Sequence, residues 1–187
     1  MVKLSIGESR PKKFKLLAWL IMKVEGIDHS HSFITWRDHD IDVRKVAEAR
    51  GSGGRIITNH QFKEENEVVN VYYYYIPEDK MKELEKWIWE NMRPYGFKHI
   101  LGILVMRTCS AIKRIFGCDK RCKNPFKDGT YSQICVELSS RAIQLAKDVD
   151  LPGDVEDYGL LEMHDINEEY SEGKADQAKL DKINGKS

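Results

Sequence analysis

The sequence predicts an α+β protein in which a small antiparallel sheet packs against helices. Three observations lead to this fold class. A helical pattern of apolar residues lies near the start of the chain, several strand-like segments follow between residues 32 and 76, and helical patterns dominate after Pro77. The order of helix, strands and then helices favours an α+β arrangement.

Length and composition fit a single folded domain. The chain has 187 residues, of which 41% are apolar and 10% aromatic, and this is enough to form a core. Lysine plus arginine and aspartate plus glutamate both count 30, so the formal net charge is zero. A strongly basic or strongly acidic protein is therefore disfavoured, and we expect no nucleic-acid partner. We expect residues 1–164 to form one domain and the polar residues 165–187 to form a flexible tail or a short surface helix.

The chain shows no sequence signal for a membrane or for export. No apolar segment approaches the roughly 20 residues that a membrane span requires. Residues 1–13 lack the apolar core and the small-residue cleavage site of a secretory signal. We therefore expect a cytoplasmic protein without a membrane span.

Residues 10–25 are predicted to form an amphipathic helix. Its apolar face repeats at spacings of three and four residues and consists of Phe14, Leu17, Ala18 and Ile21. Lysines give the remaining surface a basic character, and Gly26 ends the helix.

Four segments with strand-like patterns follow, at residues 32–37, 42–49, 55–58 and 68–76. The second of them fits a strand or a helix equally well. The last is rich in valine and tyrosine, which favour strands. Alternation along that strand would place Tyr72 and Tyr74 on one face of the sheet and Tyr73 and Tyr75 on the other.

The second half of the chain is predicted to be mainly helical. Pro77 opens a helix whose core face carries Met81, Leu84 and Ile88. The later predicted elements are a mostly buried helix at 98–116, a loop at 117–130, a helix at 132–147 and a short strand at 158–163.

Cys135 is the first candidate for a catalytic group. Ser132 is expected to cap the helix at 132–147, which would place Cys135 at the third helical position. A thiol in the first turn lies in the positive end of the helix dipole, which favours the thiolate. Small residues on the same face would let the helix approach the sheet closely, and these are Ser139, Ala142 and Ala146.

A thiolate nucleophile needs a base and a group that orients the base. His31 lies at the start of the first predicted strand, whereas the nearby His29 is expected at the surface. Glu48 lies in the next strand-like segment, where its carboxylate could accept the imidazole N–H and fix the tautomer. The expected arrangement is a thiol, an imidazole and a carboxylate, in the chain order His, Glu, Cys.

The start of the helix at 132–147 also offers an oxyanion hole. The backbone N–H of Cys135 would be one donor, and either Tyr95 or Gln133 would supply the second. Glu137 faces away from Cys135, and we expect it to form a structural salt bridge.

Four short motifs carry a family resemblance. They are Ser30-His31-Ser32-Phe33-Ile34, Val46-Ala47-Glu48-Ala49 with Gly53-Gly54 after it, Cys135-Val136-Glu137-Leu138-Ser139, and Pro152-Gly153-Asp154. In their order and spacing, the motifs resemble those of the circularly permuted papain-fold hydrolases of the NlpC superfamily. These proteins are also called YiiX-like and are related to lecithin retinol acyltransferase. The resemblance covers residues 5–160, and the cysteine motif departs from the family pattern at Val136 and Ser139.

The resemblance implies a papain-like fold with a cysteine nucleophile, a histidine base and a third polar residue. The activities that it implies are those of a peptidase, an amidase or an acyltransferase. The nucleophile would be Cys135 and the base His31. Glu48 is our choice for the third residue, and Asp42 is the alternative.

The other three cysteines leave several alternatives open. The spacing of Cys118 and Cys122 fits one half of a zinc site, with Cys109 and His99 as further candidate ligands. A disulfide between Cys118 and Cys122 would suit an oxidising setting. We expect instead that these thiols are free or merely structural, and we predict no metal and no cofactor.

We therefore expect a cysteine hydrolase that acts on a peptide, amide or acyl substrate. Cys135 would attack an acyl carbon, His31 would transfer the proton, and Glu48 would orient His31. One alternative is a catalytically silent interaction module on the same fold, because Val136 replaces the usual small residue after the nucleophile. Another is a zinc-stabilised domain that uses Cys109, Cys118 and Cys122.

Overall fold

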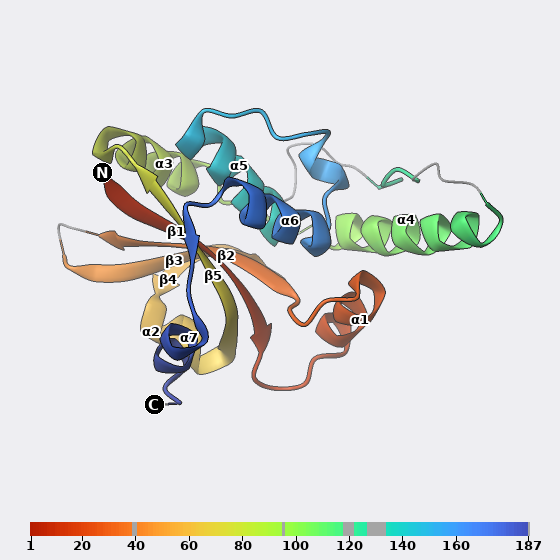
Figure 1. The fold of residues 1–187 in the computed structure, drawn as a ribbon, viewed down its shortest axis with the longest axis horizontal. Coiled ribbons are helices and arrows are strands. Elements are labelled where there is room, and N and C mark those ends of the chain that lie inside the picture. The colour runs from red at the N-terminus through yellow and green to blue at the C-terminus, as the bar shows by residue number, and fades with distance from the viewer. Residues whose placement is uncertain (39–40, 95, 118–121, 127–133, 187) are drawn as a thin grey trace.

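A computed structural model describes residues 1–38, 41–94, 96–117, 122–126 and 134–186. The described strands form one six-stranded antiparallel sheet in the order β4-β3-β2-β1-β5-β6 (Figure 1). The strands are β1 (Val2–Pro11), β2 (His31–Asp38), β3 (Val43–Arg50), β4 (Gly53–Thr58), β5 (Asn66–Ile76) and β6 (Gly173–Lys174). The α+β class with an antiparallel sheet is therefore confirmed.

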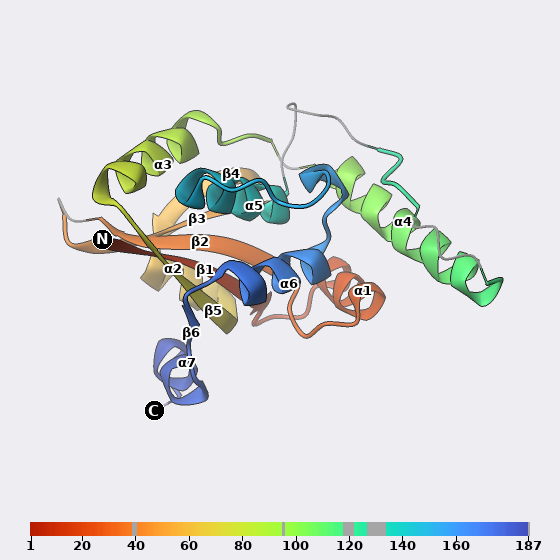
Figure 2. The same ribbon diagram turned by 45° about the horizontal axis from the view of Figure 1, so that its top comes forward.

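The described residues also form seven α-helices, which pack around the sheet. They are α1 (Leu16–Glu25), α2 (Asn59–Glu65), α3 (Glu78–Glu90), α4 (Phe97–Ile115), α5 (Cys135–Lys147), α6 (Leu160–Tyr170) and α7 (Gln177–Asn184), with one 3-10 turn at Val155–Asp157. Helices α3, α5 and α6 lie on one face of the sheet, and α2 and α7 lie on the other (Figures 1 and 2). Helices α1 and α4 lie beside each other at one end of the sheet (Figure 2).

Each face of the sheet has its own apolar core. The larger core lies beneath α3, α5 and α6, and the strands contribute Leu4, Ile6, Ile34, Trp36, Ala47, Tyr72 and Tyr74 to it. The smaller core is built from Phe33, Val46, Phe62, Val68, Val71, Ala175 and Leu180. Successive residues of a strand thus point into different cores, as the pleat requires.

Most of the predicted strands and the helix after Pro77 are confirmed. The ambiguous segment 42–49 is strand β3, because it pairs on both sides, with β2 and with β4. Tyr72 and Tyr74 are buried, whereas Tyr75 is exposed, in agreement with the predicted alternation. The core face of α3 consists of Met81, Leu84 and Ile88, as predicted.

The N-terminal prediction was wrong in two respects. Residues 2–11 form β1, which lies between β2 and β5, and the helix does not begin until Leu16. Buried polar residues in β1 hide its alternating pattern, and they are Ser5, Glu8 and Ser9. The predicted apolar face of the helix is not a core face either, since Phe14 is 76% exposed and only Ile21 packs against the larger core.

The helix predicted at 98–116 is present as α4, but it is not mostly buried. One side packs inward through Ile100, Ile103 and Met106, while several apolar side chains on the outer side are exposed. These exposed residues include Leu101, Val105, Ile112 and Ile115. Apolar residues all around a helix usually indicate burial, but α4 extends away from the sheet (Figure 1).

The C-terminal region differs from the predicted strand and flexible tail. Residues 160–170 form helix α6, because Leu160, Met163 and Ile166 recur at helical spacing and pack into the larger core. Residues 173–174 then pair with β5, and α7 buries Leu180 in the smaller core. A few apolar residues thus anchor a segment that is mostly polar.

The cysteine predictions are also corrected. Cys109 of α4 and Cys122 form a disulfide, so Cys122 does not pair with Cys118, which lies outside the described residues. A zinc site built from Cys109, Cys118 and Cys122 is contradicted, because two of its three thiols are bonded to each other.

Within the described ranges, no helix is both long and apolar enough to cross a membrane.

Gly7 of β1 offers a test of the packing between β1 and β2. A Cβ atom at this position would lie 2.1 Å from Cζ of Phe33, well inside van der Waals contact. We expect Gly7→Ala to lower the free energy of unfolding by about 1–3 kcal/mol, because the buried ring must move. Urea unfolding measures the change.

The matched control is Gly173→Ala, where the added Cβ would meet Tyr73 at an ordinary 3.8 Å. Equal stabilities for the two variants would contradict the packing of Phe33 over Gly7.

Candidate active site

Cys135 is the first residue of α5, and Ile134 is the N-cap. The expected cap, Ser132, lies outside the described residues, and Cys135 stands at the first rather than the third helical position. Glu137 supplies the side-chain acceptor for this helix start, since its Oε2 accepts a hydrogen bond from the Ile134 N–H at 2.8 Å. The carboxylate at the third helical position thus satisfies the N–H of the N-cap residue, which is one half of a capping box.

Helix α5 packs closely on the sheet, as its small residues predicted. Ser139, Ala142 and Ala146 are all buried, and the Oγ atoms of Ser139 and Ser32 lie 2.7 Å apart. This contact joins the second turn of α5 to the start of β2. It holds the N-terminal end of the helix, and therefore Cys135, close to the strand that carries His31.

His31 and Glu48 form the predicted imidazole–carboxylate pair. His31 is the first residue of β2, and its Nε2 lies 2.6 Å from Oε2 of Glu48 on β3. The ring of His31 also stacks with Phe62 of α2, with centroids 6.5 Å apart. Glu48 is buried, and its Oε1 accepts a hydrogen bond from Arg55 Nε at 2.7 Å. The carboxylate therefore holds the ring from one side while the phenyl group packs against its face.

Asp42, the alternative third residue, is not part of this group. It lies after the far end of β2, is exposed, and forms an ion pair with Arg37. The sequence reasoning missed Arg55 and Phe62. Arg55 carried a signal that could have been used, because it lies opposite Glu48 in the β3–β4 register with the complementary charge.

Cys135, at the start of α5, is close enough to His31 for its charge to act on the ring. Burial lowers the pKa of His31, but the charges of Cys135 and Glu48 and the hydrogen bond to Glu48 outweigh it and raise the pKa to about 10. The ring is therefore protonated at neutral pH.

The charge of Glu48 is fixed by the same contacts. Burial raises the pKa of Glu48, but the hydrogen bond and charge of His31 and the charge of Arg55 outweigh it and lower the pKa to about 2. An ionised carboxylate thus faces Nε2 of a protonated imidazole.

Two pockets meet at this group. The pocket beside Cys135 is mainly apolar, and its lining includes Ile21, Ile100, Ile103, Ile134 and Leu160. The pocket beside His31 and Glu48 is more polar and also includes Arg50 and Asn66. Ile21 of α1 and Ser30 line both pockets, so the sulfur and the imidazole lie where an apolar and a polar pocket adjoin.

Helix α1 is held beside these pockets by a buried ion pair. Glu25, its last residue, accepts hydrogen bonds from Nε and Nη2 of Arg107 on α4, each at 3.1 Å. This two-point contact fixes the relative positions of α1 and α4 at the apolar pocket.

The oxyanion hole stays a prediction. Cys135 is the first helical residue, and an N–H at this position has no acceptor inside its own helix. Both candidates for the second donor, Tyr95 and Gln133, lie outside the described residues. Glu137 forms the predicted structural salt bridge, with its Oε1 3.2 Å from Nδ1 of the buried His99.

His29 contradicts its predicted place at the surface, since it is only 1% exposed. It belongs to a different group, in which it contacts Glu8 and lies near His164. Nothing in the sequence pattern indicated that His164 of α6 would reach the same place, because that residue lay just after the predicted strand at 158–163 and the helix α6 was not expected.

The pH dependence of stability tests the Glu48 contacts. The lowered pKa of Glu48 stabilises the fold above its unfolded-state pKa of about 4.3, and this stabilisation is lost as the pH falls toward 2. We expect Glu48→Gln to be less stable than the wild type at pH 6 by on the order of 2 kcal/mol, with the difference shrinking between pH 4.5 and 2.

Chemical denaturation at several pH values measures this difference. Glu64→Gln, which removes an exposed carboxylate from α2, controls for the loss of one negative charge. Parallel curves for the wild type and Glu48→Gln across this pH range would contradict the assignment.

No family model matches this chain, and no curated protein matches it. The chemistry of the site is therefore inferred from its own side chains. A thiol at the start of a helix, an imidazole held by a buried carboxylate, and a backbone N–H of the first helical turn are the groups that nucleophilic acyl transfer requires.

Proposed function

We propose that the protein is a thiol hydrolase or acyltransferase with Cys135 as nucleophile, His31 as general acid and base, and Glu48 as the residue that orients His31. The observation that carries this proposal is the 2.6 Å contact between His31 and Glu48, with Cys135 near the same ring. These three groups come from α5, β2 and β3, and each is largely buried in a defined position.

The first half of the reaction forms an acyl-enzyme. Sγ of Cys135 attacks the acyl carbon, and the carbonyl electron pair moves to the oxygen, where the Cys135 N–H stabilises the charge. His31 then donates its proton to the leaving nitrogen, oxygen or sulfur as the bond to the acyl carbon breaks. The product of this half-reaction is a thioester on Cys135.

The second half regenerates the enzyme. Neutral His31 takes a proton from water, and the resulting hydroxide attacks the thioester carbon. The C–S bond breaks, the acid leaves, and the sulfur regains its electron pair beside the protonated ring. In acyl transfer an alcohol, amine or thiol takes the place of water. Glu48 remains ionised throughout and keeps Nδ1 of the ring directed at the reacting atoms.

The pockets favour a substrate with an apolar group near the reacting carbonyl. Isoleucine and leucine side chains line the pocket beside the sulfur, whereas the pocket beside the imidazole includes the polar residues Arg50 and Asn66 among apolar ones. An amide, ester or thioester with an apolar acyl or amino-acid side chain suits this division. We extend the proposal to a permuted papain-like fold, which is supported by the chain order His, Glu, Cys and by the packing of α5 on an antiparallel sheet.

One observation favours a second candidate, a catalytically silent interaction module. Cys135 is only 5% exposed, and Val136 beside it is buried in the larger core. A sulfur that reagents cannot reach would serve packing rather than catalysis. The two candidates therefore differ in the reactivity of Cys135.

The alkylation rate of Cys135 at pH 6 tests the hydrolase proposal. We expect iodoacetamide to modify Cys135 much faster than it modifies glutathione, because His31 presents a positive charge to the sulfur. His31→Ala should slow the reaction by about tenfold or more, since that charge is lost. Peptide mass spectrometry assigns the modification to Cys135.

The control variant is His60→Ala, which changes an exposed histidine on α2. A Cys135 that is unreactive at pH 6 in the wild type would overturn the hydrolase proposal and favour the interaction module. The same conclusion would follow if His31→Ala reacted as fast as the wild type.

A further inference from the structure

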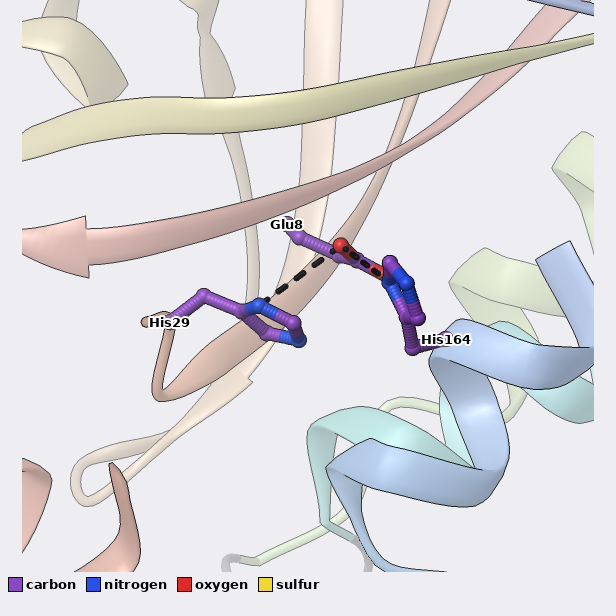
Figure 3. Close-up of side chains that lie close together, drawn as sticks. All are labelled: Glu8, His29 and His164. Carbon is purple, nitrogen blue, oxygen red and sulfur yellow. Dashed lines mark hydrogen bonds and ion pairs between the residues drawn. The ribbon is translucent and has the colours of Figure 1, made fainter. Parts of the chain in front are cut away.

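A second group of chemically capable side chains lies apart from Cys135. Glu8 of β1, His29 just before β2 and His164 of α6 converge, and one ligand atom from each lies within 4.8 Å of the others (Figure 3). Glu8 is fully buried, His29 is 1% exposed, and the His164 side chain is 30% exposed. The group is therefore enclosed on two sides and reaches solvent through His164.

Glu8 is a buried carboxylate that neighbouring amides hold in place. Asn70 Nδ2 donates a hydrogen bond to its Oε2 at 2.7 Å, and Asn167 Nδ2 donates to its Oε1 at 3.3 Å. The Nδ1 atom of His164 lies 3.1 Å from Oε2, and the Nδ1 atom of His29 lies 3.6 Å from the same oxygen. A buried charge with fixed lone pairs toward two imidazoles is a typical anchor for a cation.

His29 provides the second and independent observation. Its Nδ1 lies 3.2 Å from Oδ1 of Asp28, whereas its Nε2 is buried without a hydrogen-bond partner. If Nδ1 donates its proton to Asp28, Nε2 carries a free lone pair. Figure 3 shows that Nε2 lies on the side of the ring that faces His164. A carboxylate on one nitrogen and a bare lone pair on the other is the state in which histidine binds metals.

His164 joins the group from the opposite side. Its Nδ1 lies 3.1 Å from the hydroxyl oxygen of Tyr72, which itself donates a hydrogen bond to Glu168 at 3.0 Å. The ring is thus positioned by contacts to β1, β5 and its own helix. Because the His164 side chain is partly exposed, an ion could reach the group from solvent at this residue.

We propose that Glu8, His29 and His164 form a binding site for a divalent transition metal ion, with Zn²⁺ as the ion that fits best. Two imidazoles and one carboxylate are a common ligand set for zinc, and three protein ligands leave a fourth position for water. Carboxamide and carboxylate groups behind the ligands, from Asn70, Asn167 and Asp28, form the outer shell that such sites require.

The site would have a structural consequence for the proposed catalytic group. It connects β1, the segment before β2 and α6, which are distant in sequence. His29 precedes His31 by two residues, so an ion at this site would fix the backbone that enters β2. The metal proposal does not depend on the hydrolase proposal, because no atom of Cys135, His31 or Glu48 belongs to the ligand set.

Zinc binding to the full chain, after chelator treatment and desalting, tests this proposal. We expect one Zn²⁺ per chain in a titration against a chromophoric chelator, and a rise in melting temperature on adding Zn²⁺. His164→Ala should weaken binding by on the order of 100-fold, since even a second-shell change costs 10- to 100-fold. Glu8→Gln should do the same, and circular dichroism checks that both variants fold.

Two control variants separate this site from other ligands. His60→Ala removes an exposed histidine and should bind zinc like the wild type. Cys135→Ser should also bind zinc like the wild type, and Co²⁺ substitution should show no thiolate charge-transfer band.

Binding far below one ion per chain, or binding that survives His164→Ala unchanged, would overturn the proposal. Loss of zinc in Cys135→Ser would also overturn it, because the ion would then sit at the thiol.

Discussion

Buried carboxylates and their partners constrain how the helices of this structure lie against the sheet. Glu8, Glu25, Glu48 and Glu137 are all buried in the described part of the chain, and a buried charge without a partner would cost several kcal/mol. Each of the four carboxylates has at least one partner. The partners are His29 and His164 for Glu8, Arg107 for Glu25, His31 for Glu48 and His99 for Glu137. These pairs link strands to helices at defined points, so they set how α1, α4, α5 and α6 lie against the sheet.

The pair of Glu48 and His31 shows how this constraint becomes chemistry. A buried carboxylate that only stabilised the fold could be paired with any cation. Arg55 is such a cation for Glu48, because its Nε donates a hydrogen bond to the carboxylate. The addition of the His31 imidazole places a titratable group in contact with a fixed negative charge and near a sulfur. The fold therefore holds an imidazole protonated at neutral pH next to a potential nucleophile.

The sequence predicted the parts of the protein where local pattern and tertiary role agree. Apolar periodicity identified α3 and most strands, and the order of His31, Glu48 and Cys135 indicated the group that β2, β3 and α5 bring together. The predictions failed where buried polar residues replaced apolar ones. Strand β1 was missed because Ser5, Glu8 and Ser9 interrupt its alternation, and His29 was placed at the surface because its partner Glu8 lay in that unrecognised strand. Pairing between polar residues that are distant in sequence cannot be read from the local order of apolar and polar residues.

Trapping of an acyl-enzyme tests the central claim most directly. The wild-type protein is mixed with p-nitrophenyl acetate, quenched in acid and analysed by intact-mass and peptide mass spectrometry. We predict one acetyl group on Cys135 of the wild type, which hydroxylamine removes and which disappears with time. The acetyl group should persist longer in His31→Ala, and it should be absent from Cys135→Ala. Absence of the adduct from the wild type, or an identical adduct in Cys135→Ala, would contradict the assignment of Cys135 as the nucleophile.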